Sequence, residues 1–168
     1  YGGFSQYAKV NGDFLVKKPE NLSSKQSMIM GTAGLTALLC CFAIKAREEL
    51  LLGEKVKDVL VTGASGGVGS AAVQLIKARG ADVIAVTSGS KSQDLLTLGA
   101  TKTLNRDQRV VEALGSNSVD VVIDLVGGKS WPDFLEVLRP GGRYVVSGAI
   151  AGAIVGLDLR TLYLKDLS

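Results

Sequence analysis

Short apolar runs alternate with helical runs from residue 58 to the end of the chain. The runs at 82–88 and 119–126 are almost continuously apolar, which is typical of strands buried on both faces of a sheet. Strands that alternate with helices predict a parallel, doubly wound α/β sheet. We expect strands at 58–62, 82–88, 102–105, 119–126 and 143–149, and helices at 68–79, 92–98, 108–114, 131–139 and 157–165.

The expected helices carry recognisable signals at their ends. In the first of them, apolar residues recur three and four positions apart, and Gly80 then suits a left-handed cap. Asp107 is expected to cap the third helix, and Ser130 with Asp133 resembles a capping box for the fourth. The Pro-Gly-Gly sequence at 140–142 is expected to end that fourth helix.

The first 57 residues have a different pattern. Residues 4–10 and 14–18 are expected to form short strands of another sheet. Ser23 and Gln26 then predict a capping box, followed by a long apolar helix that reaches about residue 51. No linker composition separates this part from the rest.

One stretch of this helix is apolar enough to test against a membrane span. Residues 28–44 carry no charge, but this length is at the lower edge for a spanning helix. The stretch also contains small and polar residues such as Gly31, Thr32 and Thr36. We therefore expect a buried core helix rather than a transmembrane one.

Composition narrows the chemistry. The 168 residues carry a net charge of +3 without a basic cluster, which argues against a nucleic-acid partner. There is no histidine, so His-based catalysis and almost every zinc site are excluded from this chain, and we expect no metal. Cys40 and Cys41 lie in an apolar stretch and are expected to be buried thiols of a cytoplasmic protein.

A glycine-rich turn between the first strand and the first helix of the alternating region predicts a dinucleotide site. Residues without side chains let the backbone approach a pyrophosphate, and the helix N-terminus donates its free amides to it. The match to G-x-G-x-x-G is imperfect, because Ala64 takes the first glycine position. The residues expected to contact the pyrophosphate are Ala64, Ser65, Gly66, Gly67, Val68 and Gly69.

The end of the second strand favours NADP(H) over NAD(H). An NAD site needs an acidic residue there to bind the ribose hydroxyls. This chain instead has Ser88 and Lys91, and Arg106 follows the third strand. Hydroxyl and cationic groups suit the added charge of a 2′-phosphate.

The ends of the fourth and fifth strands should complete the site, since ligands of such sheets bind beyond the carboxyl ends of the strands. Two aspartates of the fourth strand share a face, but Asp120 lies at its far end, and Asp124 is expected to hydrogen-bond loop backbone. The sequence therefore identifies no catalytic residue. Further cofactor contacts are expected at Leu125, Val126, Gly148, Ala149 and Ile150.

Four groups of residues together resemble the medium-chain dehydrogenase/reductase superfamily, in its zinc-independent quinone oxidoreductase and acryloyl-CoA reductase-like branch. They are the run Gly-Gly-Phe-Ser-Gln-Tyr-Ala at 2–8, the run Gly-Thr-Ala-Gly-Leu-Thr-Ala at 31–37, the glycine-rich turn at 63–69, and the segments 98–100, 120–128 and 139–142 taken together. The resemblance spans nearly the whole chain.

This resemblance implies an NADPH-dependent enzyme that transfers hydride to the activated C=C bond of an enone or enoyl thioester, or to a quinone. It implies that residues 1–22 are a remnant of a GroES-like catalytic lobe. Residues 23–168 would be a Rossmann domain that stops before its sixth strand. Thr32 and Thr36 would lie near the nicotinamide edge of the cleft. Most of the substrate lobe is absent from the chain, so the chain by itself is expected to bind cofactor without turnover.

Three alternatives remain beside this reading. One is the cofactor domain of a zinc-type alcohol dehydrogenase, and another is a non-catalytic NADP(H)-binding module. The third is a short-chain dehydrogenase, whose T-G-x-x-x-G-x-G motif fits residues 62–69. That family also needs a Tyr-x-x-x-Lys pair, and no tyrosine of this chain has a lysine four residues later.

The expected partners follow from the same reasoning. The intact protein is expected to take a small-molecule substrate and to bind neither nucleic acid nor membrane. A fifth strand without a neighbour would leave an open sheet edge, and such edges pair with other chains. We therefore expect a homodimer through the edge of the sheet.

Overall fold

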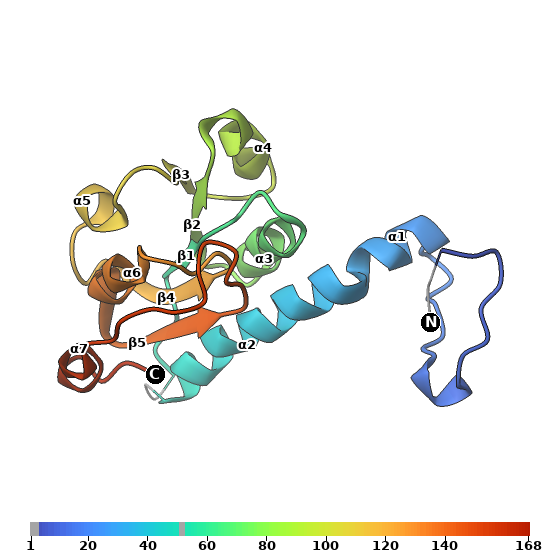
Figure 1. Cartoon of the computed structure of the whole chain (residues 1–168), viewed down its shortest axis with the longest axis horizontal. Helices are drawn as coiled ribbons and strands as arrows, with labels where there is room; N and C mark the ends of the chain where they lie inside the picture. The colour runs from blue at the N-terminus through green and yellow to red at the C-terminus, as the bar shows by residue number, and fades with distance from the viewer. Residues whose placement is uncertain (1–3, 51–52) are drawn as a thin grey trace.

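The computed structural model describes residues 4–50 and 53–168. Five parallel strands form one sheet in the order β3-β2-β1-β4-β5 (Figure 1). This order confirms the predicted Rossmann-type doubly wound α/β fold. The chain reverses its direction across the sheet between β1 and β4, which creates the crevice where such folds bind ligands.

The strands and helices lie close to their predicted positions. The strands are β1 (Asp58–Val61), β2 (Asp82–Thr87), β3 (Lys102–Asn105), β4 (Val119–Asp124) and β5 (Leu138–Val146). The α-helices are α1 (Ser24–Ile29), α2 (Leu35–Leu50), α3 (Gly67–Ala78), α4 (Ser92–Thr97), α5 (Val110–Leu114), α6 (Trp131–Val137) and α7 (Leu159–Leu164). Shorter turns are η1 (Gly12–Phe14), η2 (Met30–Gly34) and η3 (Gly89–Lys91).

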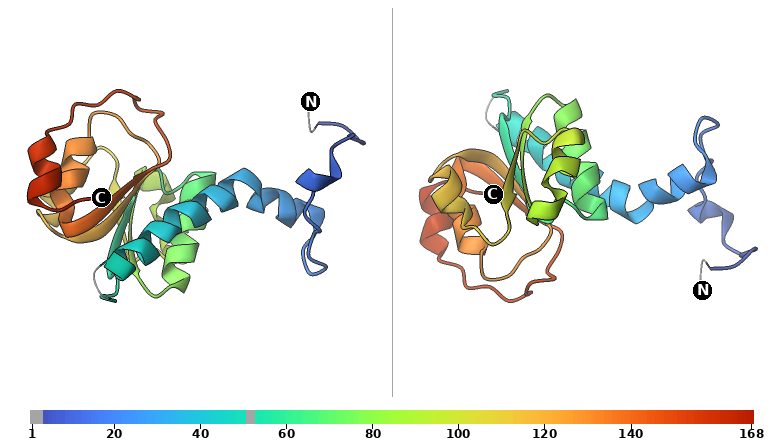
Figure 2. Two further views of the ribbon diagram at one scale, coloured as in Figure 1. Left: turned by 90° about the horizontal axis from the view of Figure 1, so that it is seen from below. Right: turned by 90° about the horizontal axis from the view of Figure 1, so that it is seen from above.

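An apolar core lies on each face of the sheet. Because side chains of a strand alternate between faces, Val59 and Val61 join one core while Leu60 joins the other. The first core includes Ile76 of α3, and the second includes Phe134 of α6. Figure 2 shows α2 and α3 on one side of the sheet and α6 and α7 on the other.

The long N-terminal helix is one rod with a kink. Ser23 and Gln26 form the predicted capping box at the start of α1. The rod bends at Gly31, whose ψ of −118° is not helical, and it continues as α2. Cys40, Cys41 and Ile44 are buried against the sheet, so the expectation of a core helix is right for this face.

The other face of the rod is apolar and exposed. Leu35, Leu38, Leu39 and Phe42 are all at least 44% exposed. By length and composition, the 26 residues Ser24–Glu49 could cross a membrane, and 28% of their most apolar window is buried. Since core helices pass the same test, this property alone is weak evidence for a membrane span.

The prediction of two strands before residue 22 is wrong for the described residues. Residues 4–22 contain no strand and only the short turn η1. Figures 1 and 2 show this segment extending from the α1 end of the rod, away from the sheet. A strand needs a neighbour for its hydrogen bonds, and the described chain places none beside this segment. Residues 2 and 3 of the 2–8 motif, and residue 51 at the expected helix end, lie outside the described residues.

Two predicted helix caps are wrong. Helix α5 starts at Val110 with Arg109 at its N-cap, and the Asp107 amide donates instead to the side chain of Asn105. At α6, Ser130 has a helical backbone and caps nothing with its side chain. The Asp133 carboxylate is held by Arg109 over 2.8 and 3.0 Å, which removes it from the predicted capping box.

The fifth strand begins earlier than predicted. Helix α6 ends at Val137 and β5 starts at once, so the Pro-Gly-Gly sequence at 140–142 belongs to the strand and does not end the helix. The register with β4 shifts between Val119 and Val121, and this irregularity accommodates the proline and glycines. The strand ends at Val146 rather than at the predicted Ala149.

The last residue returns to the outer edge of β5. The Ser168 amide donates to the Gly142 carbonyl over 3.2 Å, and the Tyr144 amide donates to the Ser168 carbonyl over 2.9 Å. The segment after helix α7 thus brings the chain back to the outer edge of β5. Lys165 fixes this return by donating to three carbonyls at the end of α6, including that of Leu135 at 3.0 Å.

Candidate functional site

A cavity of about 550 Å³ opens at the carboxyl ends of β1, β2 and β4. This is the position that the topology predicts for a ligand. Five of the predicted cofactor contacts line it, namely Ser65, Ser88, Arg106, Val126 and Ile150. The other lining residues, which we did not predict as contacts, are Thr62, Gly63, Val86, Thr87, Asp107, Gly127, Lys129, Ser130, Phe134 and Ala151.

The glycine-rich turn is built around close backbone contacts. Gly63 has a φ of +58°, a conformation that favours glycine. A Cβ on Gly69 would collide with the carbonyl oxygen of Gly63 and the backbone of Ala64, so only glycine fits there. Ala64 itself is fully buried, and its amide donates to Val86 over 3.2 Å. Ala64 therefore supports the turn and does not line the cavity.

The turn leads directly into the N-terminus of α3. Gly66 is the N-cap and has no side chain to satisfy the first amides of the helix. Those amides have no intrahelical carbonyl partner, and the helix dipole makes this end attractive to anions. Gly66 and Gly67 are exposed and Ser65 lines the cavity, whereas Val68 is half-buried and Gly69 is buried.

A buried carboxylate joins the turn to the end of β4. The Thr62 hydroxyl donates to Asp124 Oδ1 over 2.5 Å, and both side chains are buried. The amides of Val126 and Gly127 donate to the same oxygen, each over 3.0 Å. The Leu125 amide in turn donates to Thr62 Oγ1 over 2.9 Å. Asp124 thus hydrogen-bonds loop backbone as predicted, and it fixes two walls of the cavity.

Tyr144 of β5 completes this cluster by donating its hydroxyl to Asp124 Oδ2. Burial raises the pKa of Tyr144 above its ordinary value, and the neighbouring Asp124 carboxylate raises it further. The phenol therefore stays protonated and keeps its role as a donor. Four donors satisfy the Asp124 carboxylate, which explains how a fully buried acid is tolerated.

Asp120 lies at the opposite end of β4 and is not part of the cavity. It forms ion pairs with Arg47 at 3.1 Å and with Arg139 at 3.0 Å. Burial raises the pKa of Asp120, but the amides of Asp58 and Lys57 and the Arg139 guanidinium outweigh burial and leave this pKa below its ordinary value. The two aspartates of β4 are thus separate structural groups, as the sequence indicated.

The end of β2 presents an unusual hydroxyl. Thr87 is only 3% exposed and lines the cavity, yet its Oγ1 has no hydrogen-bond partner among the described residues. Buried hydroxyls normally have a partner, so this atom fits a ligand group. The next residue, Ser88, also lines the cavity, together with Arg106 from the loop after β3.

Lys91 lies outside the cavity lining. Its ammonium is 3.6 Å from the Asp94 carboxylate, and both side chains are mostly exposed. The cation that lines the cavity together with Arg106 is Lys129, which we did not predict. Lys129 follows two glycines at the carboxyl end of β4, and that position was the available sequence signal.

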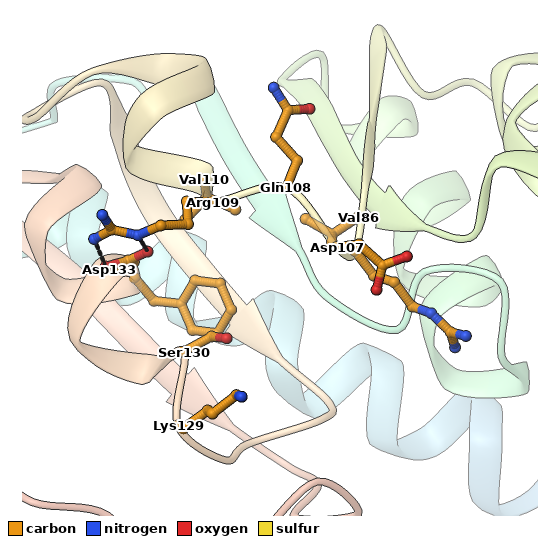
Figure 3. Close-up of a pocket in the computed structure, with 10 residues that line it drawn as sticks. Val86, Asp107, Gln108, Arg109, Val110, Lys129, Ser130 and Asp133 are labelled. Atoms are coloured by element: carbon orange, nitrogen blue, oxygen red, sulfur yellow. Dashed lines mark hydrogen bonds and ion pairs between the residues drawn. The ribbon is translucent and has the colours of Figure 1, made fainter.

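A second cavity of about 320 Å³ adjoins the first (Figure 3). Figure 3 shows Lys129 extending from the loop between β4 and α6, and Asp107 on the loop after β3. Arg109 is tied to Asp133 on the far wall. The residues that line both cavities are Val86, Arg106, Asp107, Lys129, Ser130 and Phe134.

The remaining predicted contacts lie behind or beside the lining. A Cβ on Gly148 would collide with the carbonyl of Leu125, so these two residues pack directly against each other. Ala149 is exposed next to Ile150, which does line the cavity. Leu125, Gly148 and Ala149 therefore shape the wall without lining it.

Thr32 and Thr36 also lie outside the lining of the cavity. Their segment approaches the start of α3, because Ala33 Cβ would be 3.4 Å from a Cβ on Gly67. Thr32 is exposed and Thr36 is half-buried. Their predicted position near the nicotinamide stays a prediction.

Within the described part of the chain, no three His, Cys, Asp or Glu side chains are grouped closely enough to hold a metal ion. The cavity lining instead offers hydroxyls, two cations and one acid, Asp107, and the turn that lines it leads to the first amides of α3. The hydroxyls, cations and amides are donors for an anionic organic ligand. The described residues thus suit phosphate groups.

Comparisons with known proteins agree with this geometry. Residues 67–168 match the family model described as zinc-binding dehydrogenase. The acrylyl-CoA reductase AcuI of Ruegeria pomeroyi is 40% identical over 91% of this chain and 47% of its own length. The quinone oxidoreductase of Sus scrofa is 30% identical over 88% of this chain and 45% of its own length. The chain spans about half the length of the curated relatives it matches.

Solved structures show the same similarity. The Bacillus subtilis protein yhfP with NAD bound superposes with a TM-score of 0.85 at 38% identity, covering 99% of this chain and 51% of the other. YhdH of Escherichia coli K-12 with bound NADPH gives a TM-score of 0.81 at 34% identity, covering 95% of this chain and 49% of the other.

Proposed function

The chain belongs to the zinc-binding dehydrogenase family of the medium-chain dehydrogenase/reductase superfamily, and on this premise we propose that it is the NADP(H)-binding half of a reductase. The observation that carries the proposal is the cavity at the switch point. It combines the glycine-rich turn at Gly63 and Ser65, which leads into the N-terminus of α3, with the buried Thr87 hydroxyl, which has no partner among the described residues. NADP(H) has a phosphate for each of these features: its pyrophosphate for the glycine-rich turn and its 2′-phosphate for the end of β2.

The proposed binding mode starts at the pyrophosphate. The first amides of α3, at Gly67, Val68 and Gly69, donate to its oxygens, and Ser65 adds a hydroxyl at the mouth of the turn. Gly66 keeps this surface free of side chains. The Asp124 cluster positions the turn and the β4 loop, so the chain holds the pyrophosphate between two fixed walls.

The adenosine half occupies the side of the cavity formed by β2 and β3. Thr87 and Ser88 supply hydroxyls, and Arg106 supplies a guanidinium for the 2′-phosphate. The absence of an acid at the end of β2 favours NADP(H), although one relative is known with NAD bound. Lys91 and Thr36, which the sequence indicated as cofactor contacts, lie outside the cavity lining and are not part of the proposed binding mode.

The nicotinamide half faces Val126 and Ile150 at the ends of β4 and β5. When bound, the nicotinamide supplies the hydride for the reduction. The named relatives point to an activated C=C bond or a quinone as the acceptor. This chain contributes orientation of the cofactor, because its described residues place no acid–base group among the lining residues of the nicotinamide side.

We extend the proposal to the domain boundaries, the location and the partners of the protein. Residues 1–22 belong to a catalytic lobe and residues 23–168 to the cofactor domain. The protein is cytoplasmic, takes a small-molecule substrate, and self-associates through the β5 edge. The family name refers to zinc, but this chain contains no histidine, and we propose that its own residues hold no zinc ion.

A charge placed at the helix N-terminus tests the proposal. In Gly66→Asp the new carboxylate caps α3, and Asp at an N-cap stabilises a helix. The same carboxylate stands where the pyrophosphate binds and repels it. A Cβ on Gly66 would lie 3.3 Å from the Gly63 carbonyl oxygen, and this close contact offsets part of the capping. We therefore expect the melting temperature to change little while NADPH affinity, measured by fluorescence titration, falls at least about tenfold, which is the effect of a 1.4 kcal/mol repulsion.

The matched control is Gly66→Asn, which caps the helix without a charge. It is expected to bind NADPH more tightly than Gly66→Asp does. Equal NADPH binding by wild type and Gly66→Asp would contradict the proposed pyrophosphate site. Binding that is equally weak in both variants would assign the effect to bulk instead of charge.

A further inference from the structure

Two cations in the adenosine side of the cavity have no acidic partner. Among the ion pairs of the described residues, none includes Arg106 or Lys129. By contrast, the neighbouring Arg109 is held by Asp133 at 2.8 Å and by Glu112 at 3.3 Å. Lys91 is likewise engaged, with Asp94 at 3.6 Å. Arg109 and Lys91 are thus held by carboxylates, whereas Arg106 and Lys129 are available to bind an anionic ligand.

The two available cations come from different strands. Arg106 follows β3, and Lys129 follows β4 after Gly127 and Gly128. Both line the main cavity and also the second cavity beside it. Both residues therefore lie on loops that enclose the adenosine side. Arg106 follows β3, which is the neighbour of β2, and Lys129 follows β4, which is the neighbour of β1.

The loop that carries Lys129 is held in a defined conformation. Gly127 and Gly128 have φ values of +66° and +85°. A Cβ on either would crowd the segment 148–152, and the Gly128 amide donates to the Gly152 carbonyl over 3.0 Å. Gly127 is also tied to Asp124. Lys129 thus projects from a fixed backbone, which suits a residue that recognises a ligand.

The cavity lining that includes these cations matches a phosphorylated ribose. Thr87 contributes a buried hydroxyl without a partner, and Ser88 contributes a second hydroxyl. A phosphate monoester carries close to two negative charges at neutral pH and accepts several hydrogen bonds. Two hydroxyls and two unpaired cations are a complementary set for it, whereas the single acid Asp107 leaves the lining with a net positive charge.

From these observations we infer that Lys129, and not Lys91, is the specificity-determining lysine that binds the 2′-phosphate of NADP(H) together with Arg106. The inference rests on the proposed function and deepens it. It assigns discrimination between NADPH and NADH to a residue of the β4–α6 loop. The usual position at the end of β2 contributes only hydroxyls.

The test compares two lysine variants in the full chain. Lys129→Met and Lys91→Met each replace the lysine by an uncharged side chain of similar length, and each removes one exposed positive charge. NADPH and NADH are titrated separately by fluorescence at low salt. We expect Lys129→Met to lose about tenfold or more in NADPH affinity, as for a lost hydrogen bond to a charged group. NADH affinity should change less than about twofold, and Lys91→Met should change neither by more than that.

Two further readouts separate phosphate recognition from a general structural effect. Lys129→Arg keeps the charge and should restore most of the NADPH affinity. The difference between wild type and Lys129→Met should shrink as the pH falls below about 6, where the phosphate takes up a proton. Equal melting temperatures of the variants would show that folding is not the cause.

The outcomes are distinguishable. A wild type that binds neither dinucleotide overturns the proposed function itself. A wild type that prefers NADPH while Lys129→Met is unaffected overturns only the role of Lys129. A loss of NADPH affinity in Lys91→Met without one in Lys129→Met also overturns the role of Lys129. An equal loss of NADPH and NADH affinity in Lys129→Met overturns it as well, because such a loss would assign Lys129 to the adenine ring, which both cofactors share.

Discussion

The Thr62 hydroxyl lies 2.5 Å from Asp124 Oδ1, and this buried hydrogen bond joins the ends of β1 and β4 at the point where the strand order reverses. Both partners also bind the backbone that follows β4. The bond therefore fixes the width of the crevice, and it links folding stability with the geometry of the ligand cavity.

Breaking this bond should destabilise the protein. Thr62→Val leaves Asp124 without one donor and the Leu125 amide without its acceptor. We expect a loss of about 2 kcal/mol in the free energy of unfolding, since a buried unsatisfied polar group costs about 1–3 kcal/mol. Urea denaturation measures it. Tyr144→Phe, which removes only one donor, should lose about 1 kcal/mol, and a larger loss there than in Thr62→Val would contradict this account.

The ion pairs of Asp120 predict a defined pH dependence. The pKa of Asp120 is below its ordinary value in the folded protein. Its contribution to stability is therefore fully present above the unfolded pKa of about 3.9 and is lost as pH falls through the lower, folded pKa. Asp120→Asn should destabilise the protein at pH 7 and flatten the acid limb of the stability curve. Urea midpoints at several pH values measure this, and an unchanged acid limb would argue against the assignment.

Two glycines of the phosphate turn should respond oppositely to alanine. Gly69→Ala places a methyl group against the Gly63 carbonyl and should destabilise the fold by about 1–3 kcal/mol. Gly67→Ala meets only Ala33 at 3.4 Å and lies in a helix, so it should be neutral or stabilise by up to about 1 kcal/mol. Melting temperatures of the two variants decide the matter; equal values would show that the turn is more pliable than its contacts indicate.

The chain is expected to bind NADPH without reducing a substrate. It spans about half of its curated relatives, and its described residues place no acid–base group among those lining the nicotinamide side. NADPH oxidation is followed by absorbance with a simple quinone and with an enone. Turnover that disappears in Gly66→Asp would show that this chain alone forms a complete active site.

The sequence predicted the fold because its signals are local and repeated. Buried runs such as the one ending at Asp124, and the glycine turn before α3, are dictated by strand burial and backbone sterics. The capping box at Ser23 and Gln26 formed as predicted. The one predicted at Ser130 and Asp133 failed because a tertiary contact outweighed it: Arg109 reaches across to Asp133, which a local pattern cannot reveal. The early start of β5 depends in the same way on its pairing with β4.

The sequence predicted those lining residues of the cavity whose position depends on a single strand and the turn after it. It did not predict lining residues whose position depends on how several segments come together. Ser65, Ser88 and Arg106 follow single strands and line the cavity as expected. Lys129 was missed because it lies three residues beyond the predicted contact Val126, and only the folded loop after β4 brings it into the same cavity as the ends of β2 and β3. Lys91 was favoured by its position in the chain, but the turn η3 directs it toward Asp94.

The most direct test of the account is a fluorescence titration of the wild-type chain with NADPH and with NADH under the same low-salt conditions. The account predicts saturable binding of both at one site, with NADPH at least about tenfold tighter, as expected for charge-assisted hydrogen bonds to the 2′-phosphate. Equal or tighter binding of NADH would contradict the phosphate-binding role of the adenosine side, and no binding of either would contradict the cofactor site itself.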